Sequence, residues 1–394
     1  MLPMFKRTWA QVNLDHIAHN IREVRRITSK NAKIMAVVKA DAYGHGFLEV
    51  SKTLLENGAD ALAVATLDEA VQLRKRGIQV PILILGYTSE EGVDELVELN
   101  IIPTVFHYSL ACAISDAAVS KGKKAKIHIK VDTGMTRVGF LCHDNIDEHS
   151  DTVQTIFDIA KLPGIEIEGI FTHFASADEK DSSFTHLQFK RFMKLCNILE
   201  EHGLHIPIKH VCNSAGIIQY PEMHLDMVRP GIILYGLYPS EDVNKEKVNL
   251  IPAMQLKAVI THIKEVESGV PVSYGRVYTT SRKSVIATVP IGYADGYSRL
   301  LTGKAKMLVR GHIVPVVGCI CMDQCMIDVT GIQDLKVGDE VIIFGTDDDK
   351  SILVEDIAEA MGTINYEILC SIGKRIPRVY IHNGQIVEVL NYLV

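Results

Sequence analysis

Residues 34–46 have the sequence IMAVVKADAYGHG, in which an apolar run ends in Lys39 and opens into a loop bracketed by Gly44 and Gly46. The apolar run predicts a buried strand. An ammonium group at the edge of an apolar core loses hydration, so its pKa falls and its neutral amine becomes a better nucleophile. Such an amine can form a Schiff base with an aldehyde, and the loop could hold a phosphate with Tyr43 as a hydroxyl donor. An aldehyde and a phosphate on one small molecule describe pyridoxal 5'-phosphate (PLP), although a lone strand-end lysine can also simply reach out to water.

The first two-thirds of the chain alternates apolar runs with stretches of helical period. The predicted strands are Ile34–Val38, Ala61–Ala65, Pro81–Leu85, Ile101–Val105, Lys126–Val131, Glu168–Thr172, Ile208–Cys212 and Asp226–Arg229. Eight strand–helix units in sequence predict an α/β fold in which the strands close into a parallel, TIM-like barrel. A doubly wound open sheet is the alternative.

The pattern changes after Pro239, where a polar stretch at Glu241–Asn249 resembles a linker. Later runs have the period and composition of strands. They are Gln255–Ile263, Ser284–Val289, Lys306–Leu308, Ile313–Val317, Met326–Val329 and Glu340–Phe344, and Thr8–Leu14 alternates in the same way. We therefore predict a PLP-binding α/β barrel over residues 12–240 and a mostly-β domain over 241–394 that also takes in residues 1–11.

Composition narrows the class of protein. A formal net charge of −7 gives no basic excess for binding nucleic acid. No run approaches 18 apolar residues, so we expect no membrane span and a cytoplasmic protein. The 8 cysteines include a cluster, Cys319, Cys321 and Cys325, that lacks the C-x-x-C spacing of zinc and redox sites, so we expect reduced thiols and no metal.

Polar residues end the predicted barrel strands, where barrel active sites lie. They are Lys39 on the first strand, Lys130, Asp132 and Arg137 on the fifth, His173 on the sixth, Asn213 and Ser214 on the seventh, and Arg229 on the eighth. Each has an ordinary structural explanation when taken alone. Together they place several cations on one rim, which requires an anionic ligand.

These residues suit PLP chemistry. Ser214 and the backbone N–H groups of Gly231 and Ile232 could bind the phosphate after the seventh and eighth strands. Arg229 could face the pyridine nitrogen. Because arginine does not readily give up a proton, the ring would stay unprotonated and act as a weaker electron sink. That would favour reversible proton exchange over decarboxylation or transamination.

Several motifs now bear comparison with a known family. In order, they are AVVKADAYGHG at 36–46, KVDTGMTRVG at 130–139, THFA at 172–175, NSA at 213–215, VRPG at 228–231, SYG at 273–275, GYADG at 292–296, CMDQ at 321–324 and TINYE at 363–367. This series resembles the alanine racemases from about residue 5 to the C-terminus. The resemblance implies interconversion of L-alanine and D-alanine, an isomerase reaction that supplies D-alanine for peptidoglycan.

The resemblance also implies a head-to-tail homodimer in which each active site combines one subunit's barrel with the other subunit's β domain. Lys39 would be the base on the D-alanine face, and Tyr274 of the partner subunit would serve the L-alanine face. Opposed acid and base groups are what racemisation at a planar carbon needs. His173, linked to Arg229, would support the Tyr274 phenolate, whose ordinary pKa near 10 makes tyrosine a poor base.

Further roles are implied in the same way. Arg137 would approach the cofactor's phenolic oxygen and the substrate carboxylate, and the partner's Met322 N–H would reach that carboxylate. Tyr43 and Tyr366 would complete the phosphate site, with Asn213 also among the cofactor-binding residues. Lys130 would carry a carbamate that orients Arg137, the plain alternative being an unmodified lysine paired with an acid. Tyr293 and Asp323 of the partner would line the entrance.

Other functions remain open. A racemase of broader specificity, or one for serine, would share the same motifs, because size selection amounts to only about 1–3 kcal/mol per methylene. A non-catalytic PLP-binding barrel would lack a β domain and hence Tyr274 and Met322. A two-domain decarboxylase would need a carboxylate, where this chain has Arg229, at the pyridine nitrogen.

Overall fold

The computed structural model describes residues 7–347 and 349–394. It divides into two compact units. The barrel unit comprises Ile17–Ala42 and Val50–Ile251, and the β unit comprises Met1–His16 (of which 1–6 lie outside the described residues), Tyr43–Glu49 and Pro252–Val394. The domain limits expected from the sequence, 12–240 and 241–394, stay a prediction.

The barrel unit is built on parallel strands. They are β2 (Lys33–Val37), β3 (Ala61–Val64), β4 (Ile82–Ile84), β5 (Ile102–Val105), β6 (Ala125–Asp132), β8 (Ile165–Phe171), β9 (Ile208–His210) and β10 (Met227–Val228). Their order is β10-β2-β3-β4-β5-β6-β8-β9, with the short β7 (Phe140–Leu141) beside β6. Two backbone hydrogen bonds bring the ends of this order together, from Asp226 N–H to Lys209 O at 3.1 Å and from Arg229 N–H to Cys212 O at 3.0 Å. The predicted barrel is confirmed.

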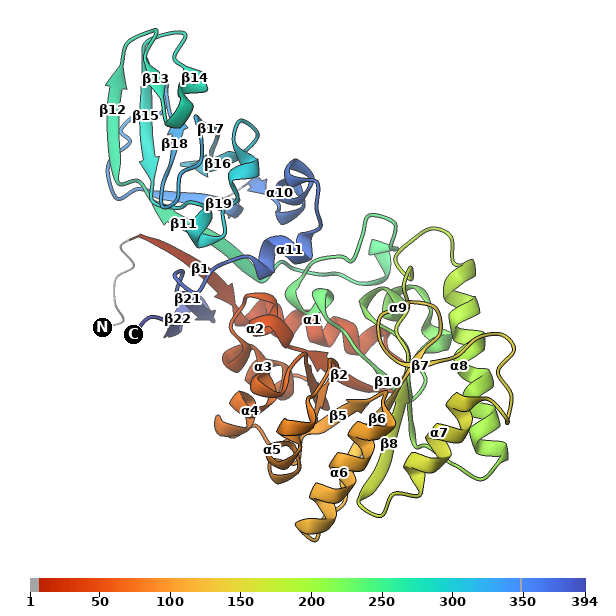
Figure 1. The fold of residues 1–394 in the computed structure, drawn as a ribbon. Coiled ribbons are helices and arrows are strands. Elements are labelled where there is room, and N and C mark those ends of the chain that lie inside the picture. Colours follow the sequence, from red (N-terminus) through yellow and green to blue (C-terminus); the bar gives the residue numbers. More distant parts are fainter. Residues whose placement is uncertain (1–6, 348) are drawn as a thin grey trace. The chain divides into compact units, whose positions relative to one another are not determined.

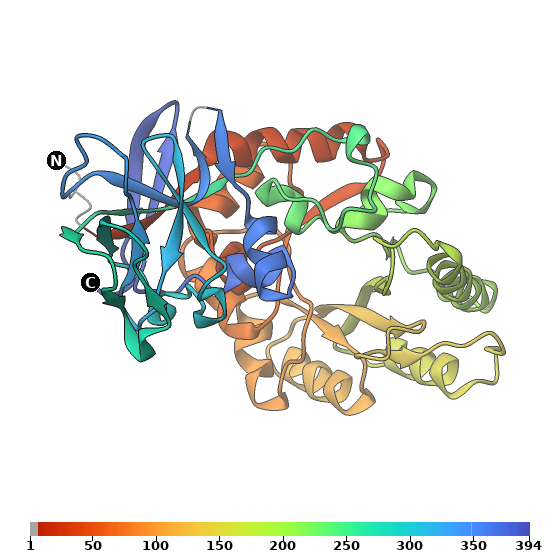
Figure 2. The ribbon, with the colours of Figure 1, turned by 90° about the horizontal axis from the view of Figure 1, so that it is seen from above.

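Helices surround these strands, as Figures 1 and 2 show. They are α1 (Leu14–Ile27), α3 (Phe47–Glu56), α4 (Leu67–Lys75), α5 (Val93–Glu98), α6 (Tyr108–Ser120), α7 (Asp151–Ala160), α8 (Ser183–Glu201) and α9 (Ser214–Gln219). In α8 the residues Phe192, Leu195 and Leu199 are at most 1% exposed, and their i, i+3, i+7 spacing puts them on the face that covers the strands. Gly203 follows α8 with φ of 87°, a left-handed conformation that ends the helix.

The β unit contains one large sheet and a small hairpin. The strands of the large sheet are β1 (Thr8–Asn13), β11 (Met254–Val259), β12 (His262–Val266), β15 (Ser284–Val289), β16 (Lys306–Val309), β17 (His312–Val317), β18 (Cys325–Asp328), β19 (Glu340–Asp347), β20 (Lys350–Ile352), β21 (Arg378–His382) and β22 (Gln385–Leu390). The hairpin pairs β13 (Pro271–Val272) with β14 (Tyr278–Thr279). Helices α10 (Val354–Met361) and α11 (Asn365–Cys370) complete the unit.

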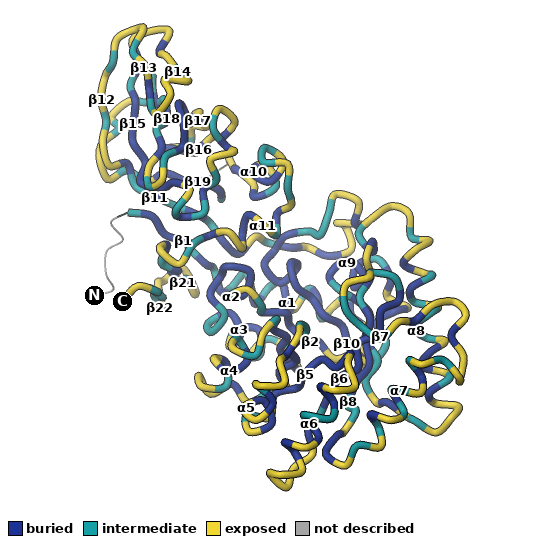
Figure 3. Tube along the Cα trace, viewed as in Figure 1, coloured by how far each residue is buried: buried dark blue, intermediate teal, exposed yellow. Residues whose placement is uncertain are grey.

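The alternating segment near the N-terminus joins this sheet. Strand β1 pairs antiparallel with β11 and parallel with β21, so it lies inside the sheet rather than at an edge. Figure 3 shows β1 and the barrel strands β2 and β10 as largely buried. Within the described residues, no helix is both long and apolar enough to cross a bilayer.

Two local predictions were wrong. The run Gln255–Ile263 is not one strand, because the chain leaves the sheet at Ile260, whose N–H donates to Asp339 O at 2.9 Å, and starts again as β12. The stretch Glu241–Asn249 is not a free linker either. It contains a 3-10 turn (Lys245–Lys247), and Asn249 N–H donates to Glu23 on α1 at 3.0 Å.

Candidate active site

Lys39 begins a backbone turn of rare geometry directly after β2. Ala40, Asp41 and Ala42 have φ of 52–55° and ψ of 47–51°, which is a left-handed helical turn. Non-glycine residues adopt this conformation at a cost of about 1–2 kcal/mol each. Strain of this kind persists only where the surroundings hold it, and it tends to gather at functional sites.

The carboxylate of Glu69 holds the start of this turn. Its Oε1 accepts from Ala40 N–H at 2.6 Å, and its Oε2 accepts from Ala65 N–H at 2.7 Å. Glu69 also closes the capping box of α4 with Thr66. Glu69 was not among the residues predicted for the site, although the pattern Thr66-x-x-Glu69 is a recognisable signal for the start of a helix.

Four cations surround His173, which follows β8. Burial, and then the charges of Arg229, Arg137, Lys130 and Lys39, hold the pKa of His173 well below its usual range. The imidazole is therefore neutral at physiological pH. Four basic residues predicted for the rim therefore act on one imidazole within the barrel unit, and a grouping of this kind would attract an anion.

Arg229 is deeply buried, with 3% of the residue exposed. Its Nη2 donates to Thr172 O at 2.8 Å and Val211 O at 3.0 Å, and lies 3.4 Å from His173 Nδ1. Burial lowers its pKa to about 10, so the guanidinium stays charged at neutral pH. Among the described residues, no carboxylate forms an ion pair with it.

Lys130, on β6, is 3% exposed and lies beside Arg229. Burial, reinforced by the Arg229 charge, lowers the pKa of its amine to about 7. Its Nζ donates to Val131 O at 2.7 Å and sits 5.6 Å from the centre of the Phe171 ring. In the part of the chain that the structure describes, no acid forms an ion pair with Lys130.

The loop that carries Arg137 is shaped by Asp132 and by a glycine. Asp132 Oδ1 accepts from Gly134 N–H at 2.9 Å and from Thr136 N–H at 3.0 Å. At Gly139 a Cβ atom would meet Asp132 N at 2.5 Å, so only glycine allows this close return of the loop to β6. The Arg137 side chain is exposed.

Part of the predicted phosphate-binding set, namely Ser214, Gly231 and Ile232, follows β9 and β10. Gly231 N–H donates to Ser214 Oγ at 2.9 Å. Asn213 caps α9 by accepting from Gly216 N–H at 3.0 Å, and Ile232 is fully buried as it begins a 3-10 turn. Of the three groups that we expect to donate to the phosphate, Ser214 and Gly231 are thus in direct contact, and Ile232 follows Gly231 in the chain.

In the β unit, Tyr274 projects from a strained turn. Ser273 before it has φ of 67°, and the tyrosine is 68% exposed. Ser273 Oγ donates to Cys319 O at 2.7 Å, which ties the turn to the segment that continues to Met322. An exposed tyrosine on a fixed backbone suits a residue that acts outside its own unit.

The predicted entrance residues belong to the same part of the β unit. Tyr293 N–H donates to Cys321 O at 3.2 Å, and Ala294 N–H donates to Met322 O at 3.0 Å. Gly292 permits this contact, because a Cβ there would meet Cys321 O at 2.2 Å. The backbone thus holds the predicted substrate-binding and entrance segments against each other.

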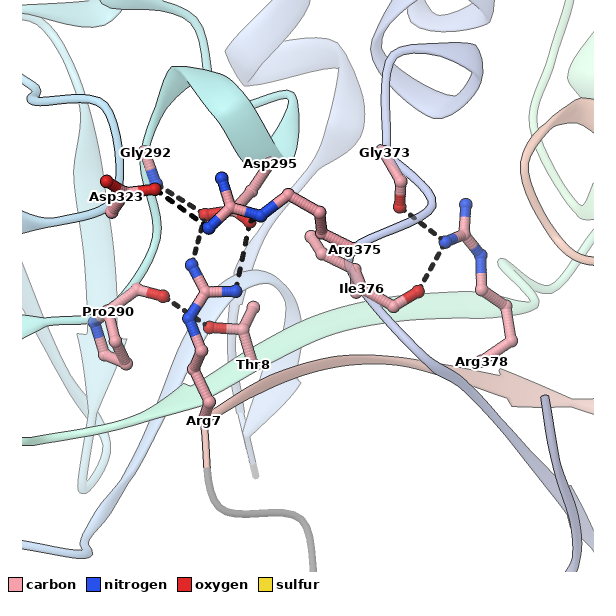
Figure 4. A network of polar contacts seen from close by, with 10 residues as sticks. All are labelled: Arg7, Thr8, Pro290, Gly292, Asp295, Asp323, Gly373, Arg375, Ile376 and Arg378. Atoms are coloured by element: carbon pink, nitrogen blue, oxygen red, sulfur yellow. Dashed lines mark hydrogen bonds and ion pairs between the residues drawn. The ribbon is translucent and has the colours of Figure 1, made fainter. Parts of the chain in front are cut away.

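A network of arginine and aspartate side chains contacts these segments, as Figure 4 shows for Arg7, Asp295 and Arg375. Asp295, whose side chain is fully buried, pairs with both guanidinium nitrogens of Arg7 at 3.1 and 2.6 Å and lies 3.6 Å from Arg375 Nε. Arg375 in turn donates to Asp323 at 2.8 Å. The contact with Arg375 therefore restrains the carboxylate of Asp323, which is predicted to line the entrance.

Comparison with known proteins shows the family. The family model for the alanine racemase N-terminal domain matches residues 12–239, and that for the C-terminal domain matches residues 253–380. The alanine racemase of Clostridium tetani is 51% identical over 394 residues, which cover 99% of this chain and all of that protein. The chain belongs to the alanine racemase family.

Solved structures of alanine racemases have the same fold over the whole chain. The enzyme of Clostridium difficile 630 is 46% identical with a TM-score of 0.94, and each chain is fully covered. The enzyme of Bacillus anthracis, whose structure has bound L-Ala-P, is 37% identical with a TM-score of 0.92 over 99% of both chains. The resemblance drawn from the motifs is confirmed.

Within this alanine racemase chain, the predicted site residues fall into two sets. The barrel unit holds Lys39, Lys130, Arg137, His173, Asn213, Ser214, Arg229, Gly231 and Ile232, and the β unit holds Tyr43, Tyr274, Tyr293, Met322, Asp323 and Tyr366. Tyr43 and Tyr366 are neighbours, with ring centres 6.1 Å apart. Burial raises the pKa of the Tyr43 hydroxyl well above its usual range, so this group is a hydrogen-bond donor and not an anion.

Proposed function

We propose that this chain interconverts L-alanine and D-alanine with PLP as its cofactor. The observation that carries the proposal is the gathering of Arg229, Arg137, Lys130 and Lys39 around His173, in a chain of the alanine racemase family. Such a cluster of basic side chains suits an anionic, phosphorylated ligand. A lysine at a strand end suits covalent attachment of an aldehyde.

The residues present fit PLP. When bound, the cofactor supplies an aldehyde that captures amino groups and a ring that withdraws electrons from the bonds at the α-carbon. Lys39 would hold the aldehyde carbon, and Ser214 with the backbone N–H groups of Gly231 and Ile232 would hold the phosphate. The phosphate roles of Tyr43, Tyr366 and Asn213 stay predictions.

Arg229 is proposed to face the pyridine nitrogen. It keeps its proton at neutral pH because its pKa, though lowered by burial, is still about 10. A guanidinium can only donate hydrogen bonds, so the nitrogen opposite it must be an unprotonated acceptor. This limits electron withdrawal by the ring and favours return of the proton to the α-carbon over loss of carbon dioxide.

Two bases on opposite faces are assigned to proton transfer. Lys39 is proposed for the D-alanine face and Tyr274 of the partner subunit for the L-alanine face, which requires a homodimer. The exposed Tyr274 in the β unit supports this assignment. Neutral His173, 3.4 Å from Arg229, is proposed to accept from or donate to the tyrosine hydroxyl and so to share its charge.

Substrate contacts and the entrance follow from the same reading. Arg137 and the Met322 N–H of the partner subunit are proposed to bind the alanine carboxylate, and Tyr293 and Asp323 to line a narrow mouth. In bacteria, the product D-alanine would supply peptidoglycan.

Lys130 is proposed to carry a carbamate. A carbamate forms when a neutral amine attacks carbon dioxide and releases one proton, and a pKa lowered to about 7 leaves much of this amine neutral at physiological pH. The resulting anion would lie beside Arg229 and Arg137, where a cation is repelled. Density for a carboxyl group on Nζ would support the modification, and a bare amine at high bicarbonate would contradict it.

The decisive experiment follows the α-proton. Purified protein with PLP is incubated with L-alanine or L-serine in deuterated water, and the α-proton signal and the D-isomer are measured by NMR and chiral chromatography. We expect loss of the signal and growth of the D-isomer with alanine. Equal turnover of serine would replace alanine specificity with a broader racemase, and no exchange with either substrate would reject catalysis.

A further inference from the structure

Two buried histidines behind Arg229 have no role in the function proposed above. Arg229 Nη1 lies 2.8 Å from His210 Nδ1, and His210 Nε2 lies 2.9 Å from His128 Nδ1. His128 Nε2 then lies 3.4 Å from Glu168 Oε2. Both histidines are at most 1% exposed, and the Glu168 side chain is 15% exposed. A continuous polar path thus runs from the buried guanidinium to a carboxylate near the surface.

Chemistry at the arginine end fixes the protons along this path. A guanidinium can only donate, so His210 Nδ1 must be the acceptor. In a neutral ring the proton then lies on Nε2, from which it is donated to His128 Nδ1. The proton of His128 must in turn lie on its Nε2.

The carboxylate end gives the same answer independently. His128 Nε2 forms no hydrogen bond within the described residues, but an ionised carboxylate can only accept, so the charge of Glu168 favours a hydrogen on the nitrogen that faces it. At 3.4 Å the contact is longer than a well-formed hydrogen bond, and it acts mainly as an attraction between the carboxylate charge and the N–H dipole. A second proton on either ring would set two N–H groups against each other.

The titration behaviour of the members agrees with neutral rings between two charges. Burial, and then the Arg229 charge, hold the pKa of His210 well below its usual range, and burial lowers that of His128. The His128 contact is the main cause that lowers the pKa of Glu168 to about 2, with help from Lys126 at 2.6 Å. Lys130 also faces His210 and adds to its shift.

The strand geometry makes specific room for this path. Between β6 and β8 the register slips, so that Ile127 pairs with Ile167 but His128 pairs with Gly169, which leaves Glu168 as the extra residue of a bulge. Bulges of this kind redirect a side chain. At Gly169 a Cβ would lie 2.5 Å from His128 Cε1, so only glycine leaves space for the imidazole.

Phe171 packs against both the rings and the guanidinium. It stacks on His210 with centres 4.7 Å apart and planes 9° apart, and Arg229 Cζ lies 5.2 Å from its centre. The near-parallel stacking on Phe171 restrains the plane of the His210 ring. The low local dielectric strengthens each polar contact along the path.

We infer that Glu168, His128 and His210 form a relay that fixes the orientation of Arg229 and balances its charge, which makes Glu168 a positioning residue for the racemisation proposed above. Its carboxylate is the negative end of a chain of aligned N–H dipoles that points at a guanidinium with no acid of its own. Only the expected effect of the relay on the reaction rate depends on the proposed function. The positions of the protons on the two histidines do not, because they can be measured whether or not the protein turns over a substrate.

The first test is therefore independent of activity. Protein labelled with ¹⁵N-histidine and loaded with PLP is studied by long-range ¹H–¹⁵N NMR, with the two rings assigned among 16 histidines by His128→Gln and His210→Gln. We expect both rings to be neutral and protonated on Nε2 throughout the neutral pH range. An imidazolium, or an Nδ1–H form, in either ring of the wild-type protein would overturn the relay.

The second test measures alanine racemisation in Glu168→Leu, Glu168→Gln and a matched control, Glu166→Gln. Glu166 is an exposed glutamate two residues earlier on β8. We expect kcat to fall about 10- to 100-fold in Glu168→Leu, as for other residues that orient a site through a hydrogen bond, and the His128 tautomer to become mixed. Glutamine keeps an acceptor, so Glu168→Gln should keep the tautomer and lose less activity, which also covers the case in which the leucine variant fails to fold.

These outcomes separate the two proposals. If the wild-type protein shows the expected tautomers but racemises nothing, the proposed function fails and the relay stands. If Glu168→Gln and Glu168→Leu match Glu166→Gln in both kcat and the imidazole signals, the relay is refuted.

Discussion

Replacing Glu69 by alanine tests whether the strained turn after Lys39 is held from outside. The substitution removes acceptors for the N–H groups of Ala40, at 2.6 Å, and Ala65, at 2.7 Å. Hydrogen bonds to charged groups contribute about 1.5–3 kcal/mol each. Because Glu69 is partly exposed and water can replace it, we take the lower end for each of the two hydrogen bonds and expect a loss of about 3 kcal/mol in the free energy of unfolding.

The loss of these two hydrogen bonds should also weaken the binding of PLP. The left-handed residues Ala40, Asp41 and Ala42 together store about 3–6 kcal/mol at roughly 1–2 kcal/mol each. The two Glu69 hydrogen bonds are of similar size, so their removal should let the turn relax and move Lys39. We therefore expect Glu69→Ala to weaken PLP binding as well as stability.

Urea unfolding of the apoprotein and PLP titration by absorbance measure the two effects. Asp68→Ala is the matched control, because Asp68 lies in the same first turn of α4 and the described residues show no hydrogen bond to its side chain. Glu69→Gln keeps one acceptor oxygen and should fall between the two. The reasoning is refuted if Glu69→Ala and Asp68→Ala agree within about 0.5 kcal/mol, the usual range for surface substitutions, and bind PLP equally well.

Three other predictions concern the proposed bases and Lys130. Tyr274→Phe should slow α-proton exchange from L-alanine far more than from D-alanine, whereas equal slowing would reject the two-base assignment. Lys39→Ala should abolish the visible absorption of lysine-bound PLP, and a surviving band would place the attachment elsewhere. The pKa of Lys130 is lowered from 10.5 to about 7, so above pH 7 the unfolded chain binds more protons than the folded one and stability rises with pH. Urea unfolding in bicarbonate-free buffer should show a rise of at most about 1.4 kcal/mol per pH unit that Lys130→Met lacks, and parallel curves would contradict it.

The barrel could be predicted because most of its strands are rich in apolar residues. All eight expected runs overlap observed strands, although β6, β8 and β9 also carry charged residues and histidines. The pairs β13–β14 and β21–β22 were missed. The first has strands of two residues, which is too short for a period, and most of β22 is exposed and so lacks a buried face.

For the barrel unit, the sequence predicted which residues follow the strands, but it did not predict the backbone conformation around them. Strand ends identified Lys39, His173 and Arg229, because a parallel barrel brings strand ends together. The left-handed turn at Ala40–Ala42 was not foreseeable, since alanine gives no signal for positive φ. Only the capping-box spacing of Thr66 and Glu69 could have indicated a role for Glu69.

The contacts between Glu168 and His128 could not be predicted from the alternation of side chains along a strand. Glu168 was expected to begin a regular strand, and in such a strand Glu168 and Gly169 would point to opposite faces. The bulge instead sets both residues opposite His128, one to contact its Nε2 and the other to make space for its ring. A register slip depends on the neighbouring strand, so one strand's own sequence does not specify it.

The two buried basic residues of the barrel unit, Arg229 and Lys130, differ in whether they can lose their charge. Arg229 and Lys130 are each 3% exposed, and the Arg229 charge adds to the burial that lowers the pKa of Lys130, yet only the lysine can become neutral near pH 7. Arg229 must remain a cation, and the Glu168 relay is the route by which a carboxylate reaches it without touching it. A carboxylate in direct contact with Arg229 would compete for the N–H groups that are proposed to face the pyridine nitrogen. A carboxylate two imidazoles away stabilises the same charge without touching Arg229, because His210 and His128 lie between the two groups.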